Sequence, residues 1–279
     1  MKIKLRGVDY HYEQTGFGTP VLLLHGFTGS STTWRFLEKE AAEQKIRLIA
    51  VDIIGHGLTE CPERPNRYAI TEAAKDLAAL LDVLKLDAIH LVGYSMGGRL
   101  ALSFSCMFAE RVRTLTLESA SPGLKTETER QRRRDRDAHL AARIRNYGLL
   151  SFVNDWENIP LFASQKDLPK TVRSSLRDQR LANSEHGLAG SLIGMGTGAQ
   201  PSWWTQLATL HVPTLLITGA RDRKFCTIAS EMEQALPLAE WCVVPNAGHA
   251  VHLEKPEPFK SALVSFIHRF SASAEEGRA

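Results

Sequence analysis

The chain has 279 residues, of which 43% are hydrophobic and 23% charged, and its formal net charge is +3; this suits a globular protein of one large domain, or of one domain with a sizeable insertion. So small a net charge argues against a nucleic-acid partner, and no apolar run is long enough to span a membrane. The charged N-terminus lacks the apolar core of a signal peptide, so we expect a cytoplasmic protein, and the four cysteines show no metal-ligand spacing.

The first part of the chain alternates short apolar strands with helices. Residues 2–5 and 10–13 alternate in polarity like the two strands of a hairpin. Further strands are predicted at 20–24, 47–51, 88–92 and 114–118, and helices at 34–44, 73–84 and 96–108. Continuous apolar runs such as Pro20–Leu24 suit strands that are covered on both faces, so the pattern predicts a mostly parallel, doubly wound α/β sheet.

The alternation stops at about residue 123 and resumes near residue 206. The segment between looks helical, and we expect it to be a lid over the carboxyl ends of the strands. Strands at 213–219 and 241–244 and helices at 228–236 and 256–270 follow. The expected organisation is a core of residues 1–122 and 206–270, a helical lid at 123–205, and a disordered tail at 271–279.

The strand at 88–92 runs into Gly93-Tyr94-Ser95-Met96-Gly97, a G-x-S-x-G pattern followed at once by a helix. This is the pattern of a nucleophile elbow, in which glycines allow a tight turn that exposes the serine hydroxyl. Taken alone, the motif fits a glycine-rich turn without chemistry equally well.

A serine hydroxyl needs a histidine to take its proton and an acid to orient that histidine. Asp222 and His249 each follow a predicted strand, in the order serine, acid, histidine that this elbow requires. We therefore predict the catalytic triad Ser95, Asp222 and His249, with an oxyanion hole formed by the backbone N–H groups of Phe27 and Met96. His25 is expected to be a packed histidine that shapes the loop before Phe27.

These motifs, together with His-Gly-Phe at 25–27 and Gly-His-Gly at 55–57, resemble the α/β-hydrolase superfamily over nearly the whole chain. The resemblance implies the α/β-hydrolase fold but leaves the reaction open, because this fold hosts hydrolases, haloperoxidases and lyases.

The predicted lid is basic, with eight lysines and arginines against four acidic residues between residues 125 and 145. Such a run can be a solvated helix face, a short nucleic-acid patch, or a site for a substrate that carries carboxylates. Arg99 favours the third interpretation. It lies one helical turn after Ser95, where a buried arginine needs an anionic partner, either a substrate carboxylate or, alternatively, an Asp or Glu of the lid in a structural ion pair.

A second resemblance covers both the core and the lid. It rests on Gly93–Arg99, the Ser-Pro-Gly-Leu run and the Arg-rich helix after it, Asp155-Trp156, Pro160–Ser164, Leu176-Arg177 and Arg221–Phe225. These stretches resemble the 2-succinyl-6-hydroxy-2,4-cyclohexadiene-1-carboxylate synthases of menaquinone biosynthesis. That family eliminates pyruvate from 2-succinyl-5-enolpyruvyl-6-hydroxy-3-cyclohexene-1-carboxylate, a substrate with three carboxylates.

The resemblance implies a lyase that needs no metal and no organic cofactor. It assigns substrate binding to Tyr94, Arg99, Arg133, Trp156 and Arg177. The adjacent Arg132 and Arg134 leave the register of Arg133 open.

The expected mechanism is proton abstraction: Asp222 orients His249, His249 deprotonates Ser95, and the Ser95 alkoxide removes the ring proton α to the succinyl ketone. The alternative is a serine esterase or C–C hydrolase that acts through an acyl-enzyme on a small carboxylate-bearing substrate. A non-catalytic binding protein on the same fold is a third hypothesis. The sequence does not give the oligomeric state.

Overall fold

The computed structural model describes residues 1–271, in which eight strands form one sheet in the order β1-β2-β4-β3-β5-β6-β7-β8. β1, β2 and β4 pair antiparallel, and every pair from β4 to β8 is parallel. This is the mostly parallel sheet that the alternation predicts. The strands are β1 (Lys2–Leu5), β2 (Val8–Gly16), β3 (Thr19–Leu24), β4 (Ile46–Val51), β5 (Ile89–Tyr94), β6 (Val112–Glu118), β7 (Thr214–Gly219) and β8 (Ala239–Val244).

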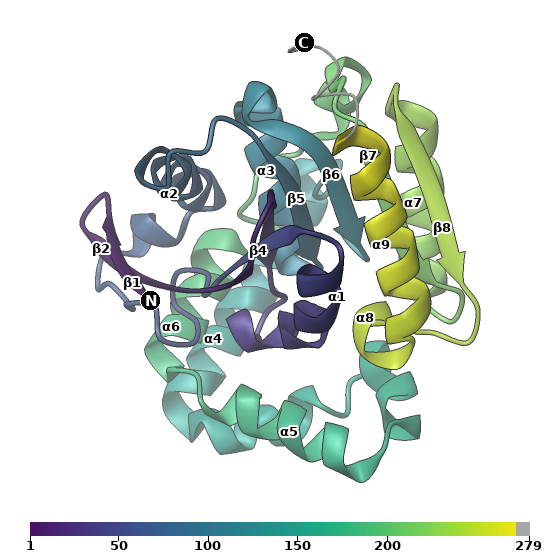
Figure 1. Cartoon of the computed structure of the whole chain (residues 1–279). Helices are drawn as coiled ribbons and strands as arrows, with labels where there is room; N and C mark the ends of the chain where they lie inside the picture. The colour runs from purple at the N-terminus through teal and green to yellow at the C-terminus, as the bar shows by residue number, and fades with distance from the viewer. Residues whose placement is uncertain (272–279) are drawn as a thin grey trace.

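Helices cover both faces of the sheet (Figure 1). One face packs against α2 (Ile70–Val83), α3 (Met96–Met107) and α7 (Arg223–Ala235), and the other against α1 (Glu38–Glu43), α8 (Val251–Glu254) and α9 (Pro256–Ser271). Successive side chains of a strand point to opposite faces, so Leu22 and Leu24 join the first apolar cluster while Val21 and Leu23 join the second. All four are fully buried, which explains why this strand reads as a continuous apolar run.

Between β6 and β7 the described chain has no strand. It forms α4 (Glu127–Trp156), the 3₁₀ helix η4 (Pro160–Asp167), α5 (Lys170–Leu181), α6 (Glu185–Met195) and the 3₁₀ helix η5 (Trp204–Thr209). α4 is interrupted at Gly148, whose φ is +81°. α4 and α6 share a small apolar core of their own, and Figure 1 shows α4, α5 and α6 on the side to which the arrowheads of β6 and β8 point.

The structure differs from the predicted elements at two helix starts. The helix expected at 34–44 is the 3₁₀ helix η1 (Ser31–Leu37) followed by α1; its buried residues Trp34 and Leu37 are three apart, as suits three residues per turn. α7 begins at Arg223 and not near 228, because the Asp222 carboxylate caps it by accepting the Phe225 N–H at 3.3 Å.

The remaining short helices are η2 (Pro65–Tyr68) and η3 (Ala109–Arg111). Of the predicted tail at 271–279, Ser271 is the last residue of α9, and residues 272–279 lie outside the described residues. Among the described helices, none has the length and apolarity needed to cross a membrane.

Candidate active site

Ser95 sits in a sharp turn between β5 and α3. Its φ of 52° and ψ of −106° are unusual for a residue with a side chain, so the backbone is strained there. A Cβ atom on Gly93 would collide with the Gly97 carbonyl group, and one on Gly97 with the Leu24 carbonyl oxygen. The two glycines of the G-x-S-x-G motif are therefore needed for this turn.

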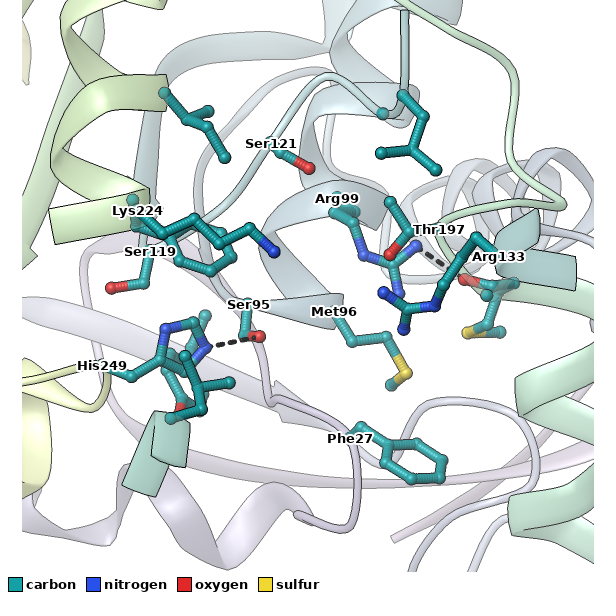
Figure 2. A pocket seen from close by; sticks show the side chains of 18 of the residues that line it. Phe27, Ser95, Met96, Arg99, Ser119, Ser121, Arg133, Thr197, Lys224 and His249 are labelled. Atoms are coloured by element: carbon teal, nitrogen blue, oxygen red, sulfur yellow. Dashed lines mark hydrogen bonds between the residues drawn. The ribbon is translucent and has the colours of Figure 1, made fainter. Parts of the chain in front are cut away.

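The structure brings together the three residues predicted as a triad, each beyond the carboxyl end of a strand. Asp222 follows β7 and His249 follows β8. His249 Nδ1 lies 2.7 Å from Asp222 Oδ2, and His249 Nε2 lies 3.0 Å from Ser95 Oγ. Figure 2 marks the hydrogen bond between His249 and Ser95 with a dashed line. Because a carboxylate only accepts hydrogen bonds, Nδ1 carries the proton and Nε2 can accept the proton of the serine hydroxyl.

Two backbone N–H groups beside Ser95 donate to no other group within residues 1–271. They belong to Phe27, in the loop after β3, and to Met96, the first residue of α3; both residues line the same cavity as Ser95. The first N–H groups of a helix have no partner inside the helix and favour negative charge. These are the two N–H groups that the sequence analysis assigns to an oxyanion hole, and that role stays a prediction.

His25 holds the peptide group that carries the Phe27 N–H. The Gly26 carbonyl, on the other side of that peptide, accepts hydrogen bonds from His25 Nδ1 at 2.8 Å and from the Gly29 N–H at 2.9 Å. His25 Nε2 accepts the Ile53 N–H at 3.0 Å, which fixes the proton on Nδ1. Burial lowers the pKa of His25 and keeps the ring neutral. His25 therefore has the loop-shaping role expected of it.

Ser95 opens into a cavity of about 410 Å³ with an aromatic wall of Phe27, Tyr94 and Trp156. The Trp156 ring lies 5.4 Å from the Phe27 ring, and Tyr94 lies 5.5 Å from the ring of His249. Trp156 Nε1 is buried and has no hydrogen-bond partner in the described chain, so it can donate to a ligand. Burial raises the pKa of Tyr94 well above its usual value, so its hydroxyl keeps its proton near neutral pH.

Arg99 is a half-buried cation of this cavity. Its Nη1 donates to two neutral acceptors, Met195 O at 2.6 Å and Gln200 Oε1 at 2.5 Å, and it forms no ion pair with any residue of 1–271. Burial and the nearby positive charge of Arg133 lower the pKa of Arg99 to about 9, and the Asp137 carboxylate acts in the opposite direction. A desolvated cation without an ion-pair partner is costly, so this end of the cavity is suited to a carboxylate group of a ligand.

Of the three adjacent arginines in α4, Arg133 is the one that lines the cavity. Its Nε lies 2.8 Å from Asp137 Oδ1, and Figure 2 shows its guanidinium next to that of Arg99, on the side of Ser95 away from His249. Arg132 is exposed, and Arg134 pairs with Glu127. The register that the sequence left open thus places Arg133 at the cavity.

The structure does not bring Arg177 to this cavity. Its guanidinium donates to Glu157 Oε1 and to Asn154 Oδ1, each at 2.6 Å. Arg180, one turn further along α5, is 95% buried and lies over the ring of Phe162 at 5.4 Å, and Phe162 does line the cavity. Sequence reasoning missed Arg180, because residues three apart share a helix face and the burial of the second depends on packing.

Lys224 is a second cation that sequence reasoning did not select. It lines the cavity from the first turn of α7, and Figure 2 shows its ammonium group directed into the space near Ser95. It forms no ion pair within the described chain. Its place two residues after Asp222 could have identified it, because Asp222 starts the helix at the mouth of the site.

Within residues 1–271, no group of three or more His, Cys, Asp or Glu side chains is arranged to hold a metal ion. The four cysteines form no disulfide.

Residues 19–256 match the family described as the alpha/beta hydrolase fold. A protein of Bacillus subtilis (strain 168), provisionally named 2-succinyl-6-hydroxy-2,4-cyclohexadiene-1-carboxylate synthase, is 49% identical over 88% of this chain and 89% of its own length. A protein of that name from Serratia proteamaculans (strain 568) is 31% identical over 88% of this chain and 92% of its own.

Two solved structures are similar over their full length. MenH from S. aureus superposes with a TM-score of 0.89 and 33% identity, covering 93% of this chain and 98% of its own. A thermophilic esterase from Thermogutta terrifontis has a TM-score of 0.84 and 27% identity, covering 97% of this chain and 99% of its own. The predicted α/β-hydrolase fold is confirmed, whereas the fold alone accommodates both a synthase and an esterase.

Proposed function

Because the chain belongs to the α/β-hydrolase family and, within it, to the family of the 2-succinyl-6-hydroxy-2,4-cyclohexadiene-1-carboxylate synthases, we propose that it is a lyase of menaquinone biosynthesis. The proposed reaction eliminates pyruvate from 2-succinyl-5-enolpyruvyl-6-hydroxy-3-cyclohexene-1-carboxylate. The product is 2-succinyl-6-hydroxy-2,4-cyclohexadiene-1-carboxylate.

One observation carries this proposal beyond the family resemblance: Arg99 lines the cavity of Ser95, is half-buried, and donates hydrogen bonds only to neutral acceptors of the described chain. A neutral ester offers nothing to such a cation, whereas a substrate with three carboxylates supplies the missing negative charge. Arg133 and Lys224, which line the same cavity, add further positive charge.

In the proposed mechanism, His249 Nε2 takes the proton of Ser95 Oγ, and Asp222 stabilises the imidazolium that forms. The Ser95 alkoxide removes the ring proton α to the succinyl ketone. The C–H electron pair forms a new ring double bond, the existing alkene shifts by one carbon, and the carbon–oxygen bond to the enolpyruvyl group breaks. The departing pyruvate enolate takes up a proton at carbon.

The other predicted residues have supporting roles in this proposal. The N–H groups of Phe27 and Met96 stabilise the negative charge that develops on the succinyl ketone oxygen. Tyr94 and Trp156 position the substrate, Tyr94 with its hydroxyl and Trp156 with its unpaired Nε1–H. On the helical side we propose Arg180 in place of Arg177, because Arg180 lies over Phe162 of the cavity wall, whereas Arg177 donates to Glu157 at 2.6 Å.

We further propose that residues 123–205 act as a lid that excludes water while the anion is bound. The following expectations stay predictions: a cytoplasmic location, no cofactor or metal, and no nucleic-acid or membrane partner.

The second candidate is a serine esterase or C–C hydrolase. The hydrogen bonds among Ser95, His249 and Asp222 favour it as much as the lyase, since both reactions begin with the same proton transfer.

One assay distinguishes the lyase from the esterase. The purified protein is mixed with the enolpyruvyl substrate, and pyruvate is followed with lactate dehydrogenase and NADH. The lyase is expected to release pyruvate far faster than the spontaneous reaction. Pyruvate release at the spontaneous rate, with turnover of a neutral aryl ester, would establish the esterase instead.

A further inference from the structure

A second hollow of about 410 Å³ lies on the outer side of the helical segment, between η4 and the first turns of α5. Five of its lining side chains are cationic and one is acidic: Lys166, Lys170, Arg173, Arg177, Arg180 and Glu157. We call this hollow the outer groove. Its single acid, Glu157, already pairs with Arg177 at 2.6 Å. Lys166, Lys170 and Arg173 form no ion pair with any described residue, so the groove holds a large excess of positive charge.

Two further features of the outer groove favour the binding of an anion. No side chain caps the N-terminus of α5, which begins at Lys170, so the free N–H groups of its first turn add to the positive potential. At the inner end of the groove, Arg180 is 95% buried; its Nη2 donates to Gln165 Oε1 at 3.0 Å, its Nη1 lies 3.9 Å from Glu157 Oε2, and its Nε has no hydrogen-bond partner within residues 1–271. Glu157 is shared with Arg177, so the buried charge of Arg180 is only partly offset and favours a bound anion.

The outer groove and the catalytic cavity both adjoin a small cavity of about 50 Å³. Gln165, Leu176 and Arg180 line both this small cavity and the outer groove. Phe27, Tyr94 and Phe162 line both the small cavity and the catalytic one. The guanidinium of Arg180 over the ring of Phe162 therefore stands between the two larger spaces.

We propose that the outer groove is an anion-binding site that captures a polycarboxylate and speeds its delivery to the adjoining catalytic cavity. The choice of a polycarboxylate rests on the proposed function; the anion site itself does not. Unpaired charges in a concave surface raise the local concentration of an oppositely charged ligand and speed its association. Capture precedes chemistry, so the groove acts on kcat/KM and leaves kcat unchanged.

Citrate binding tests the site without any turnover. Isothermal titration calorimetry is carried out on Arg99→Ala, which weakens the catalytic cavity, and on the same protein with Lys170→Ala and Arg173→Ala added. We expect the added pair to weaken citrate binding roughly tenfold. The matched control adds Arg132→Ala and Arg136→Ala, two exposed arginines of α4 without ion pairs. If the variant with the groove pair and the variant with the control pair bind citrate with equal affinity, the proposed site is overturned. If the groove binds inorganic phosphate in preference to citrate, its assignment to carboxylates is overturned.

Kinetics test the delivery. In the otherwise unchanged enzyme, Lys170→Ala with Arg173→Ala should lower kcat/KM for the tricarboxylate roughly three- to tenfold at low salt, and the difference should vanish near 0.5 M salt because exposed charges are then screened. A fall in kcat, or the same salt dependence as the Arg132→Ala, Arg136→Ala control, would contradict delivery. If the unaltered protein releases no pyruvate, the proposed function fails, and the citrate titration still decides whether the anion site exists.

Discussion

The catalytic cavity has a strand-end side, with Ser95, Asp222 and His249, and a helical side, with Arg99 of α3 and Trp156 of α4. The two sides differ in whether their polar side chains have partners within the chain. At the strand ends, His249 is hydrogen-bonded to both Asp222 and Ser95, so each side chain of the triad has its partner within the chain. On the helical side, Arg99 donates only to neutral acceptors of the described chain, and Trp156 Nε1 has no partner there. The triad is complete without a ligand, whereas the helical side lacks an anion.

This difference separates chemistry from recognition. Proton transfer depends on groups whose mutual geometry must be fixed before the substrate arrives, so protein contacts hold them. Recognition of a carboxylate depends on charges left unpaired until the substrate supplies a partner. Substitutions on the two sides should therefore change different kinetic constants.

The largest effect is expected at the strand ends. Ser95→Ala removes the group that carries the proton, so kcat for pyruvate release should fall about 10³-fold or more, while the arginines still bind the substrate. The loss of kcat is measured by pyruvate release. Retained binding is measured as the affinity for the product, by calorimetry. The His249→Ala variant should lose a similar factor, and the double variant little more, because the two residues act as a unit. Retention of a tenth of the activity by Ser95→Ala would contradict a role for the triad.

The same comparison explains what the sequence could predict. The elbow requires Gly93 and Gly97, because a Cβ at either would strike backbone atoms, and this requirement is visible as a spacing. Asp222 and His249 lie just beyond two apolar strands, and parallel strands bring their carboxyl ends to one edge. The fold and the strand-end residues were therefore predictable from local patterns.

The helical side was predictable only in part. Arg99 follows from the elbow, since α3 starts at Met96 and places it one turn later. The choice between Arg177 and Arg180 depends on how α5 packs against η4, and helical periodicity does not contain that information. Lys224 was missed for a similar reason: α7 starts five residues earlier than its apolar periodicity suggests, because Asp222 caps it.

Arg99→Ala should show the largest effect on the helical side. Removing a buried cation that pairs with a substrate carboxylate costs about 2–4 kcal/mol, so kcat/KM for the tricarboxylate should fall about 10²-fold. Hydrolysis of a neutral aryl ester, measured on the same preparation, should change little. Equal losses on the two substrates would show that Arg99 supports the fold of the site and not recognition of charge.

Arg99→Leu supplies the control for folding. Without a ligand, Arg99 is a half-buried cation that forms no ion pair within residues 1–271, so replacing it by an apolar side chain should leave Tm unchanged or raise it. A lower Tm together with lower activity would mean that the arginine is structural.

A smaller effect is expected from Arg133→Ala. Asp137 already offsets part of the charge of Arg133, so its loss should raise KM for the tricarboxylate roughly tenfold and not a hundredfold. Arg132→Ala, the exposed neighbour in the same helix, is the matched control and should leave KM unchanged. If Arg132→Ala has the larger effect, α4 lies in a different register when the substrate is bound.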